Sequence, residues 1–358
     1  MKIQKRTALR LAALVPVITI LAVLGWWLAT HKAPPKELPP LFKPTSQFAI
    51  GVNYPWRDYG VDFGANVWGS HDGVSSPAGK KEVDQDFAYI SSLGLNVVRW
   101  FVFCDGRGGL KFGQDGQVTG LDPLVLNDMY TALELAHKHQ IRIMFVILDY
   151  NFAQRATWVA GQRVGGHRKV IEKPAFTASF HNNALLPLLD AFGQSPDIAA
   201  WEIINEPEWV MTEYPFWQKS KIGVVKMQTF VRETALFIKK HAKQPVTVGS
   251  ASQDDLDYWD NADLDFLQFH SYPYLEAENH LNTPAADLGH KLPIILGEFP
   301  THNTKLSTDQ YFDLMYNNGY VGALAWSYRA SDMYSYLNQQ LPAIAAWQKA
   351  HALKAKHP

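Results

Sequence analysis

The chain has 358 residues, a formal net charge of -1, 47% hydrophobic residues and one cysteine. It is long enough to bury the core of one large domain, and its single cysteine excludes an intrachain disulfide framework and a cysteine-based zinc site. Five of the 33 basic residues and none of the 34 acidic ones lie in residues 1–32, so the rest of the chain has 28 basic and 34 acidic residues, a balance that argues against a nucleic-acid partner.

Residues 1–30 have the pattern of a membrane-spanning or signal segment. Four basic residues precede residues 11–30, a stretch of 20 residues without a charged side chain, which matches a hydrocarbon core of ~30 Å at ~1.5 Å per residue. We favour an uncleaved signal-anchor over a signal peptide, because Trp26 and Trp27 precede no distinct cleavage site. The anchor would hold the exported domain to the membrane, in the periplasm or outside the cell, and cleavage would make the protein secreted.

Residues 31–46 contain five prolines, which predict a semi-extended linker before a domain at residues 47–358. The domain alternates apolar strands with amphipathic helices, which is typical of a parallel α/β fold. We expect strands at 48–53, 96–103, 141–149, 199–205, 245–250, 264–270, 293–297 and 321–327, and helices at 81–93, 124–139, 219–242 and 308–318. The connections on either side of the sixth strand are short and weakly periodic. Eight such strands predict a (β/α)8 TIM barrel; a doubly wound open sheet is the alternative, although no glycine-rich phosphate loop follows the first strand.

Two of these strands run into a glutamate and then a proline. Glu206 precedes Pro207 at the end of the fourth strand, and Glu298 lies shortly before Pro300 at the end of the seventh. Proline cannot donate to a strand ladder, so both glutamates should lie where buried strands give way to loops. Parallel barrels carry their chemistry at that end.

Side-chain alternation predicts which other residues share the mouth of the barrel. Buried strands rarely contain charged or polar side chains without a partner or a function. We expect four sets to face one way: Val97, Arg99 and Phe101; Glu202, Ile204 and Glu206; Gln268, His270 and Tyr272; and Ile294, Leu296 and Glu298. We interpret Glu202 as a deeper, structural partner for an arginine or tyrosine.

These motifs resemble a known family. The quoted residues are Trp201-Glu202-Ile203-Ile204-Asn205-Glu206-Pro207, His270-Ser271-Tyr272-Pro273, Gly297-Glu298-Phe299, Arg99 and Trp326. Over about residues 48–330 the pattern is similar to the retaining (β/α)8 glycoside hydrolases of clan A, and most similar to family 5, the cellulase and β-mannanase family. Where family 5 usually has a histidine after the third strand, this chain reads Leu148-Asp149-Tyr150-Asn151-Phe152.

The resemblance implies a role for each matching residue. Glu206 would be the acid/base, Glu298 the nucleophile and Asn205 the partner of the sugar 2-hydroxyl. Tyr272 and Arg99 would hold Glu298, His270 would be a hydrogen-bonding residue of the site, and Trp326 would lie under the sugar at the cleaved bond. For Asp149, a structural role and a role in the site are both possible. Trp56 and Trp209 are candidate sugar-binding aromatics in the loops that follow the first and fourth strands.

Paired carboxylates at a barrel mouth suit glycoside hydrolysis, in which one protonates the leaving oxygen and the other attacks the anomeric carbon. The sequence therefore predicts a retaining β-glycoside hydrolase acting on mannan, glucan or exopolysaccharide, with carboxyl groups about 5 Å apart. Repulsion from an ionised Glu298 is expected to raise the pKa of Glu206. We predict no metal and no cofactor. The alternative function is a non-catalytic carbohydrate-binding barrel, which would not need the whole set of polar residues.

Overall fold

The computed structural model describes residues 40–211, 221–275, 280–329, 332–335 and 337–354. The predicted signal-anchor and most of the predicted linker lie outside these residues, so both stay predictions. No helix within the described ranges is long and apolar enough to cross a membrane.

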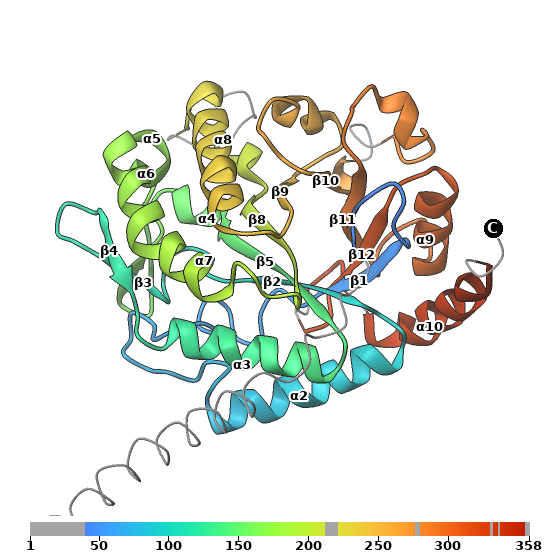
Figure 1. Ribbon diagram of the computed structural model, residues 1–358, viewed down its shortest axis with the longest axis horizontal. Coiled ribbons are helices and arrows are strands. Elements are labelled where there is room, and N and C mark those ends of the chain that lie inside the picture. The colour runs from blue at the N-terminus through green and yellow to red at the C-terminus, as the bar shows by residue number, and fades with distance from the viewer. Residues whose placement is uncertain (1–39, 212–220, 276–279, 330–331, 336, 355–358) are drawn as a thin grey trace, which may run out of the picture. The chain divides into compact units, whose positions relative to one another are not determined.

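Eight parallel strands close into a barrel, and the other elements surround them (Figure 1). The hydrogen-bonded order is β1-β12-β11-β10-β9-β8-β5-β2, and β2 closes the ring by pairing with β1. This closure confirms the TIM barrel and excludes the open doubly wound sheet. Each predicted strand corresponds to one barrel strand: β1 Ala49–Asn53, β2 Val97–Phe101, β5 Arg142–Asp149, β8 Ile198–Asn205, β9 Val246–Ser250, β10 Leu267–His270, β11 Ile294–Pro300 and β12 Gly322–Trp326.

The predicted helices correspond to α2 Pro77–Ser92, α3 Val125–Lys138, α8 Val224–His241 and α9 Thr308–Asn317. Helix α2 begins before residue 81, because the Ser76 side chain caps it by accepting from the Gly79 N–H and Pro77 fits the first turn. A capping box between Ser307 and Gln310 starts α9. Within the described residues, the remaining α- and π-helices are α4 Tyr150–Ala153, α5 Lys169–Glu172, α6 Pro174–Phe180, the π-helix η1 His181–Leu185, α7 Leu186–Phe192 and α10 Leu337–Lys354.

Short elements fill several loops at the carboxyl ends of the strands. The weakly periodic connections after β9 and β10 contain, within the described residues, only the 3₁₀ helices η3 Asp254–Trp259, η4 Pro273–Leu275 and η5 Ala285–Leu288, and another, η2 Pro207–Val210, follows β8. Two antiparallel hairpins were not expected from the sequence: β3 Leu110–Phe112 with β4 Val118–Leu121, and β6 Thr157–Val159 with β7 Gln162–Val164. They lie in the loops after β2 and β5.

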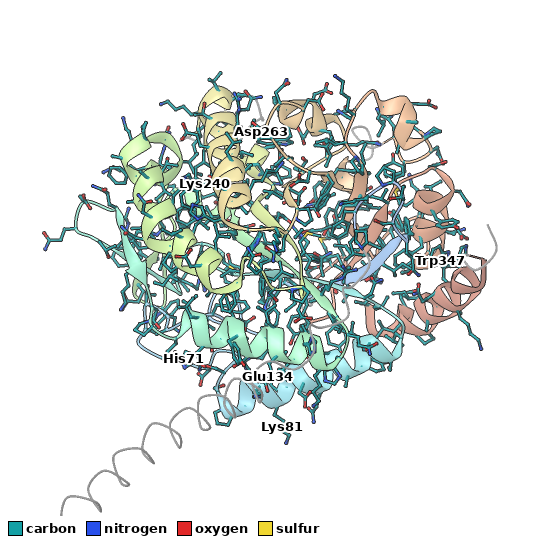
Figure 2. All side chains as sticks on the ribbon, in the orientation of Figure 1. His71, Lys81, Glu134, Lys240, Asp263 and Trp347 are labelled. Carbon is teal, nitrogen blue, oxygen red and sulfur yellow. The ribbon has the colours of Figure 1, made fainter. Side chains whose placement is uncertain are left out.

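The apolar core forms two main layers. The larger one fills the space between the sheet and the helices, while charged side chains such as Lys81, Glu134 and Lys240 extend outward from the helices (Figure 2). The smaller one lies inside the barrel and includes Leu41 and Phe42, with the Phe42 ring stacked at 4.5 Å on Phe266. Leu41 and Phe42, which fall within the residues predicted as linker, therefore pack inside the barrel.

Two strands break the expected alternation. Along β8, Glu202 pairs with Thr247 and Asn205 pairs with Gly249. The step between these two pairs covers three residues of β8 but only two of β9, so β8 contains a bulge. A similar bulge in β11 lies between Leu296 and Phe299. Bulges redirect side chains. As a result Ile204, Ile294 and Leu296 pack in the outer layer, so the prediction that they share an inward face with the glutamates is wrong.

Candidate active site

The two glutamates meet at the carboxyl ends of the strands. Glu206 directly follows β8, and Glu298 lies near the end of β11. Both side chains are buried, and an oxygen of each carboxyl group lies within 4.8 Å of an oxygen of the other. This upper limit on the distance between the nearest oxygens is compatible with the expected carboxyl separation of about 5 Å.

Glu298 accepts hydrogen bonds from a cation and from a phenol. The Arg99 Nη1 donates to Oε1 at 2.5 Å, and the Tyr272 hydroxyl donates to Oε2 at 2.7 Å. Burial raises the pKa of Glu298, and the Arg99 charge and the Tyr272 hydrogen bond oppose this rise because they stabilise the carboxylate. The structure thus brings Arg99 and Tyr272 to the residue that the resemblance says they hold.

Arg99 is fully buried and is the centre of a polar network. Its Nε and Nη2 each donate to a Glu202 carboxylate oxygen at 2.6 Å, its Nη2 also donates to Asn205 Oδ1, and its Nη1 donates to Asn53 Oδ1. Burial alone would lower the pKa of the guanidinium, but the carboxylates of Glu202 and Glu298 raise it. Glu202 therefore is the deeper structural partner that the sequence predicted.

The network also depends on residues that the sequence reasoning did not assign to the site. Asn53, at the end of β1, accepts from Arg99 Nη1 through its side-chain oxygen and donates to the Gly297 carbonyl through its side-chain nitrogen. A Cβ at Gly249 would lie 2.5 Å from Glu202 Oε1 and 3.0 Å from Arg99 Nη2, so this position requires glycine. The only sequence signals were an asparagine and a glycine at strand ends.

The side chains that hydrogen-bond to the Glu206 carboxyl group are His270 and Trp209, and both are neutral near pH 7. Its backbone is left-handed, with φ 45°, and its N–H donates to the Gly249 carbonyl. The His270 Nδ1 lies 2.8 Å from Glu206 Oε1 and 3.6 Å from Glu298 Oε1. The Trp209 Nε1 donates to Glu206 Oε2 at 3.0 Å. Trp209, expected as a sugar-binding aromatic, thus contacts the glutamate itself.

The protonation states follow from these surroundings. Burial raises the pKa of Glu206 to about 7, against a smaller lowering by Trp209 and Arg99. Burial also lowers the pKa of His270 to about 4, so this imidazole is neutral near pH 7. The expected cause was repulsion from Glu298, and this expectation is corrected: burial contributes most to the raised pKa of Glu206.

Asp149 connects to the same network through Asn205. Asp149 Oδ2 accepts from Asn205 Nδ2 at 2.9 Å, while Asp149 Oδ1 accepts from the Asn151 N–H at 2.9 Å. Because Arg99 donates to the Asn205 oxygen and Asp149 accepts from its nitrogen, the orientation of the amide is fixed. Burial raises the pKa of Asp149 to about 7. Asp149 is therefore linked to the site by its hydrogen bond with Asn205.

Aromatic side chains line the rim beside the glutamates. Trp326, at the end of β12, is half-buried and donates to Asp332 at 2.7 Å. Its ring lies 6.2 Å from that of Trp56, edge to face. On another side the Tyr272 ring stacks on Tyr274 at 5.5 Å. The structure thus brings Trp326 and Trp56 together.

Two groups of described residues have a spacing that could hold a metal ion. The first is Glu206, His270 and Glu298, and its carboxylate oxygens already accept from Arg99, Tyr272 and Trp209. The second is the group of Asp257, Asp260 and His290, whose aspartates are exposed. Neither group leads us to assign a metal centre.

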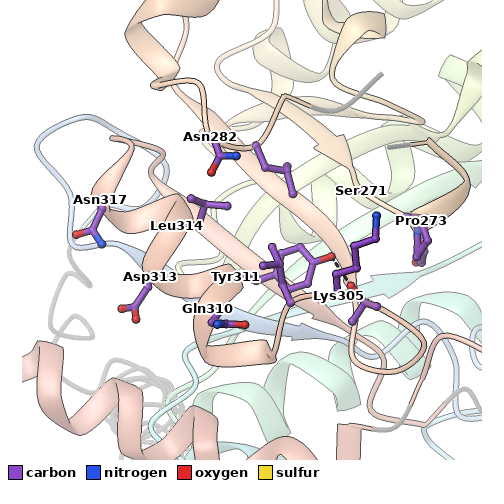
Figure 3. A pocket seen from close by; sticks show the side chains of 13 residues that line it. Ser271, Pro273, Asn282, Lys305, Gln310, Tyr311, Asp313, Leu314 and Asn317 are labelled. Atoms are coloured by element: carbon purple, nitrogen blue, oxygen red, sulfur yellow. Dashed lines mark hydrogen bonds between the residues drawn. The ribbon is translucent and has the colours of Figure 1, made fainter. Parts of the chain in front are cut away.

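Tyr272 also lines a separate hollow of about 530 Å³, which Figure 3 shows. Its wall includes Ser271, Lys305 and Tyr311, and the Tyr311 hydroxyl contacts that of Thr304 at 2.8 Å. Neither glutamate lines it. The paired glutamates therefore lie at the barrel mouth and not in this hollow.

The chain is similar to known mannanases, although no protein-family profile matches it. It is 26% identical over 323 residues to a mannan endo-1,4-β-mannosidase of Mytilus edulis, covering 78% of this chain and 83% of the relative. It is also 26% identical over 335 residues to a mannan endo-1,4-β-mannosidase of Cryptopygus antarcticus, covering 80% of this chain and 83% of the relative.

The fold is shared as well. The X-ray structure of the β-mannanase from Mytilus edulis superposes with a TM-score of 0.71 at 25% identity, covering 85% of this chain and 92% of that one. These similarities bear out the resemblance seen in the motifs. The protein is a glycoside hydrolase, and its sequence and fold resemble those of the clan A enzymes of family 5.

Proposed function

We propose that the protein is a retaining endo-β-mannanase. The observation that carries this proposal is the pair of buried carboxylates within 4.8 Å of each other, one held by a cation and one by neutral groups. Retaining glycosidases have carboxyl groups roughly 5–5.5 Å apart, whereas inverting enzymes need roughly 6.5–9.5 Å to admit a water molecule. The short separation therefore favours double displacement.

In the first step, an ionised Glu298 oxygen attacks the anomeric carbon and forms a glycosyl ester. The glycosidic C–O bond breaks as Glu206 transfers its proton to the leaving oxygen. A Glu206 pKa of about 7 keeps this carboxyl group protonated in mildly acidic solution. Arg99 and Tyr272 stabilise the charge on Glu298 before the attack.

In the second step, the ionised Glu206 takes a proton from water while the water oxygen attacks the anomeric carbon. The ester bond to Glu298 breaks, and the sugar leaves with its original configuration. Glycosylation has by then removed the charge of Glu298, and the new charge of Glu206 remains near the guanidinium of Arg99. One carboxyl group thus acts first as acid and then as base.

Mannan is the substrate that we favour over glucan or exopolysaccharide. Both relatives described above carry the name mannan endo-1,4-β-mannosidase, and the match spans 83% of each. Internal cleavage of the polymer is inferred from the same names.

The test is turnover of a panel of polysaccharides by the purified full chain, with the anomeric configuration of the first product followed by NMR. We expect cleavage of β-1,4-mannan with retention. A product of inverted configuration would disprove the double displacement, and cleavage of a glucan in preference to mannan would disprove the substrate. Absence of any β-glycan cleavage would favour the carbohydrate-binding alternative.

We also propose that the enzyme acts outside the cytoplasm and stays attached to the membrane. The support is the uncharged stretch of residues 11–30 behind four basic residues. Cell fractionation with N-terminal sequencing tests this. A soluble exported protein that starts after residue 29 would disprove the anchor, and a cytoplasmic protein would disprove export.

A further inference from the structure

A line of aromatic contacts leads away from the catalytic glutamates along the rim. Trp326 contacts Trp56 at 6.2 Å, and Trp56 contacts Tyr59 at 4.8 Å. The Arg107 guanidinium then lies over the Tyr59 ring at 4.5 Å and near the Trp68 ring at 5.6 Å. Rings and guanidinium together form a continuous set of flat groups, which we call the aromatic tract.

Salt bridges and hydrogen bonds hold the tract in place. Arg107 Nε and Nη2 donate to the Asp105 carboxylate, with the shortest contact at 2.7 Å. The Trp68 Nε1 donates to the Ala160 carbonyl at 3.2 Å. Ala160 lies at the turn between β6 and β7, so this bond joins the loop after β1 to the hairpin after β5.

The two faces of the hairpin differ in burial at Val164 and Trp158. Val164 is buried, whereas Trp158 pairs across the strands with Arg163 and belongs to the opposite face. The Trp158 side chain is 72% exposed. The other tryptophans in the described part of the chain are buried or half-buried, so Trp158 differs from all of them.

The hairpin and the tract lie at the same end of the barrel as the glutamates. Their loops follow β1, β2 and β5, and β2 pairs with both of the other strands. The carboxyl ends of parallel barrel strands form one rim. An exposed aromatic ring on this rim, in the hairpin that the Trp68–Ala160 hydrogen bond joins to the tract, is placed to meet a long substrate.

We propose that Trp158, with Arg163 beside it, forms a distal sugar-binding site for a β-linked glycan chain that extends along the aromatic tract. This inference rests on the proposed function. Flat aromatic faces pack against the apolar faces of pyranose rings, and a guanidinium donates to hydroxyl groups. Core packing does not explain a tryptophan with most of its surface in water. The distal site holds long chains and is not reached by short ones.

Binding of manno-oligosaccharides of increasing length tests this inference. The measurement is calorimetric titration of the full chain carrying Glu298→Gln, so that no ligand is cleaved. Adding Trp158→Ala should weaken binding of the longest oligosaccharides about tenfold and leave that of mannobiose unchanged. Trp158→Phe, which keeps a ring, should restore most of the affinity.

Tyr130→Ala is the matched control, because Tyr130 is a 63% exposed aromatic on α3, outside the loops of the rim. This variant should bind every length as the parent does. Equal binding of long chains by the parent and by Trp158→Ala would overturn the distal site while leaving the proposed function intact. If the parent binds no β-mannan oligosaccharide of any length, both the distal site and the proposed substrate are wrong.

Discussion

The two glutamates that we propose as catalytic are both buried but have opposite surroundings. Glu298 accepts from the permanently charged Arg99 and from Tyr272, whereas Glu206 contacts the neutral His270 and Trp209. Burial raises the pKa of both carboxyl groups, and only Glu298 has a cation hydrogen-bonded to it. The difference shows how one residue type supplies both a nucleophile and an acid: the neighbours decide which glutamate ionises first.

The strongest test of this comparison is Glu298→Ala. Loss of the nucleophile should lower the turnover of mannan by roughly three or more decades, because no glycosyl ester can form. Azide can enter the vacated space and attack directly, which gives a product of inverted configuration. Rescue with retained configuration would mean that Glu298 and Glu206 have the opposite roles.

Glu206→Ala should affect substrates according to their leaving groups. Mannan has a poor leaving group and should lose roughly three decades in rate, whereas an aryl mannoside with a good leaving group should lose much less in the first step. Azide attacking the glycosyl enzyme should give a product of retained configuration. An equal loss for both substrates would rule out Glu206 as the proton donor.

The regular strands explain how much of the site the sequence could predict. Strands β2 and β10 keep their alternation, so Arg99, His270 and Tyr272 were placed correctly by counting every second residue. Strands β8 and β11 carry bulges, and there the same counting put Ile204 and Leu296 on the wrong face. A bulge leaves no fixed signal in a single sequence.

Other features depend on contacts between distant parts of the chain. Asn53 and Arg99 meet only because β1 and β2 are neighbours in the closed barrel. Leu41 is buried inside the barrel although it follows two prolines that predict an extended linker. The hairpin of β6 and β7 has strands of three residues, too short for a periodic pattern.

Tyr272→Phe should make the Glu298 carboxyl group harder to ionise. The lost hydroxyl stabilises the carboxylate and so lowers the pKa of Glu298, and its removal should raise that pKa. The acid limb of the pH profile of kcat/KM, below which Glu298 is protonated, should then move to higher pH, with a loss of about one decade in rate at pH 5.

Tyr54→Phe is the matched control for Tyr272→Phe. Tyr54 is also buried and donates to a carboxylate at 2.7 Å, but its partner is Asp86. This variant should lose a similar amount of stability and keep the acid limb of the parent. An unchanged acid limb in Tyr272→Phe itself would show that the hydroxyl does not set the ionisation of Glu298.

The smallest expected effect is that of Trp209→Phe on the pKa of Glu206. The Trp209 N–H stabilises the ionised form of Glu206, so its removal should raise the pKa of Glu206 above about 7. Activity needs a protonated Glu206, and the alkaline limb of kcat/KM should therefore move to higher pH, by about one unit or less. Trp347→Phe is the matched control, because it removes a hydrogen bond from a tryptophan to Asp313 on α9. This variant should leave the alkaline limb unchanged. A raised KM with no movement of the limb would instead make Trp209 a sugar platform, the role that the sequence suggested.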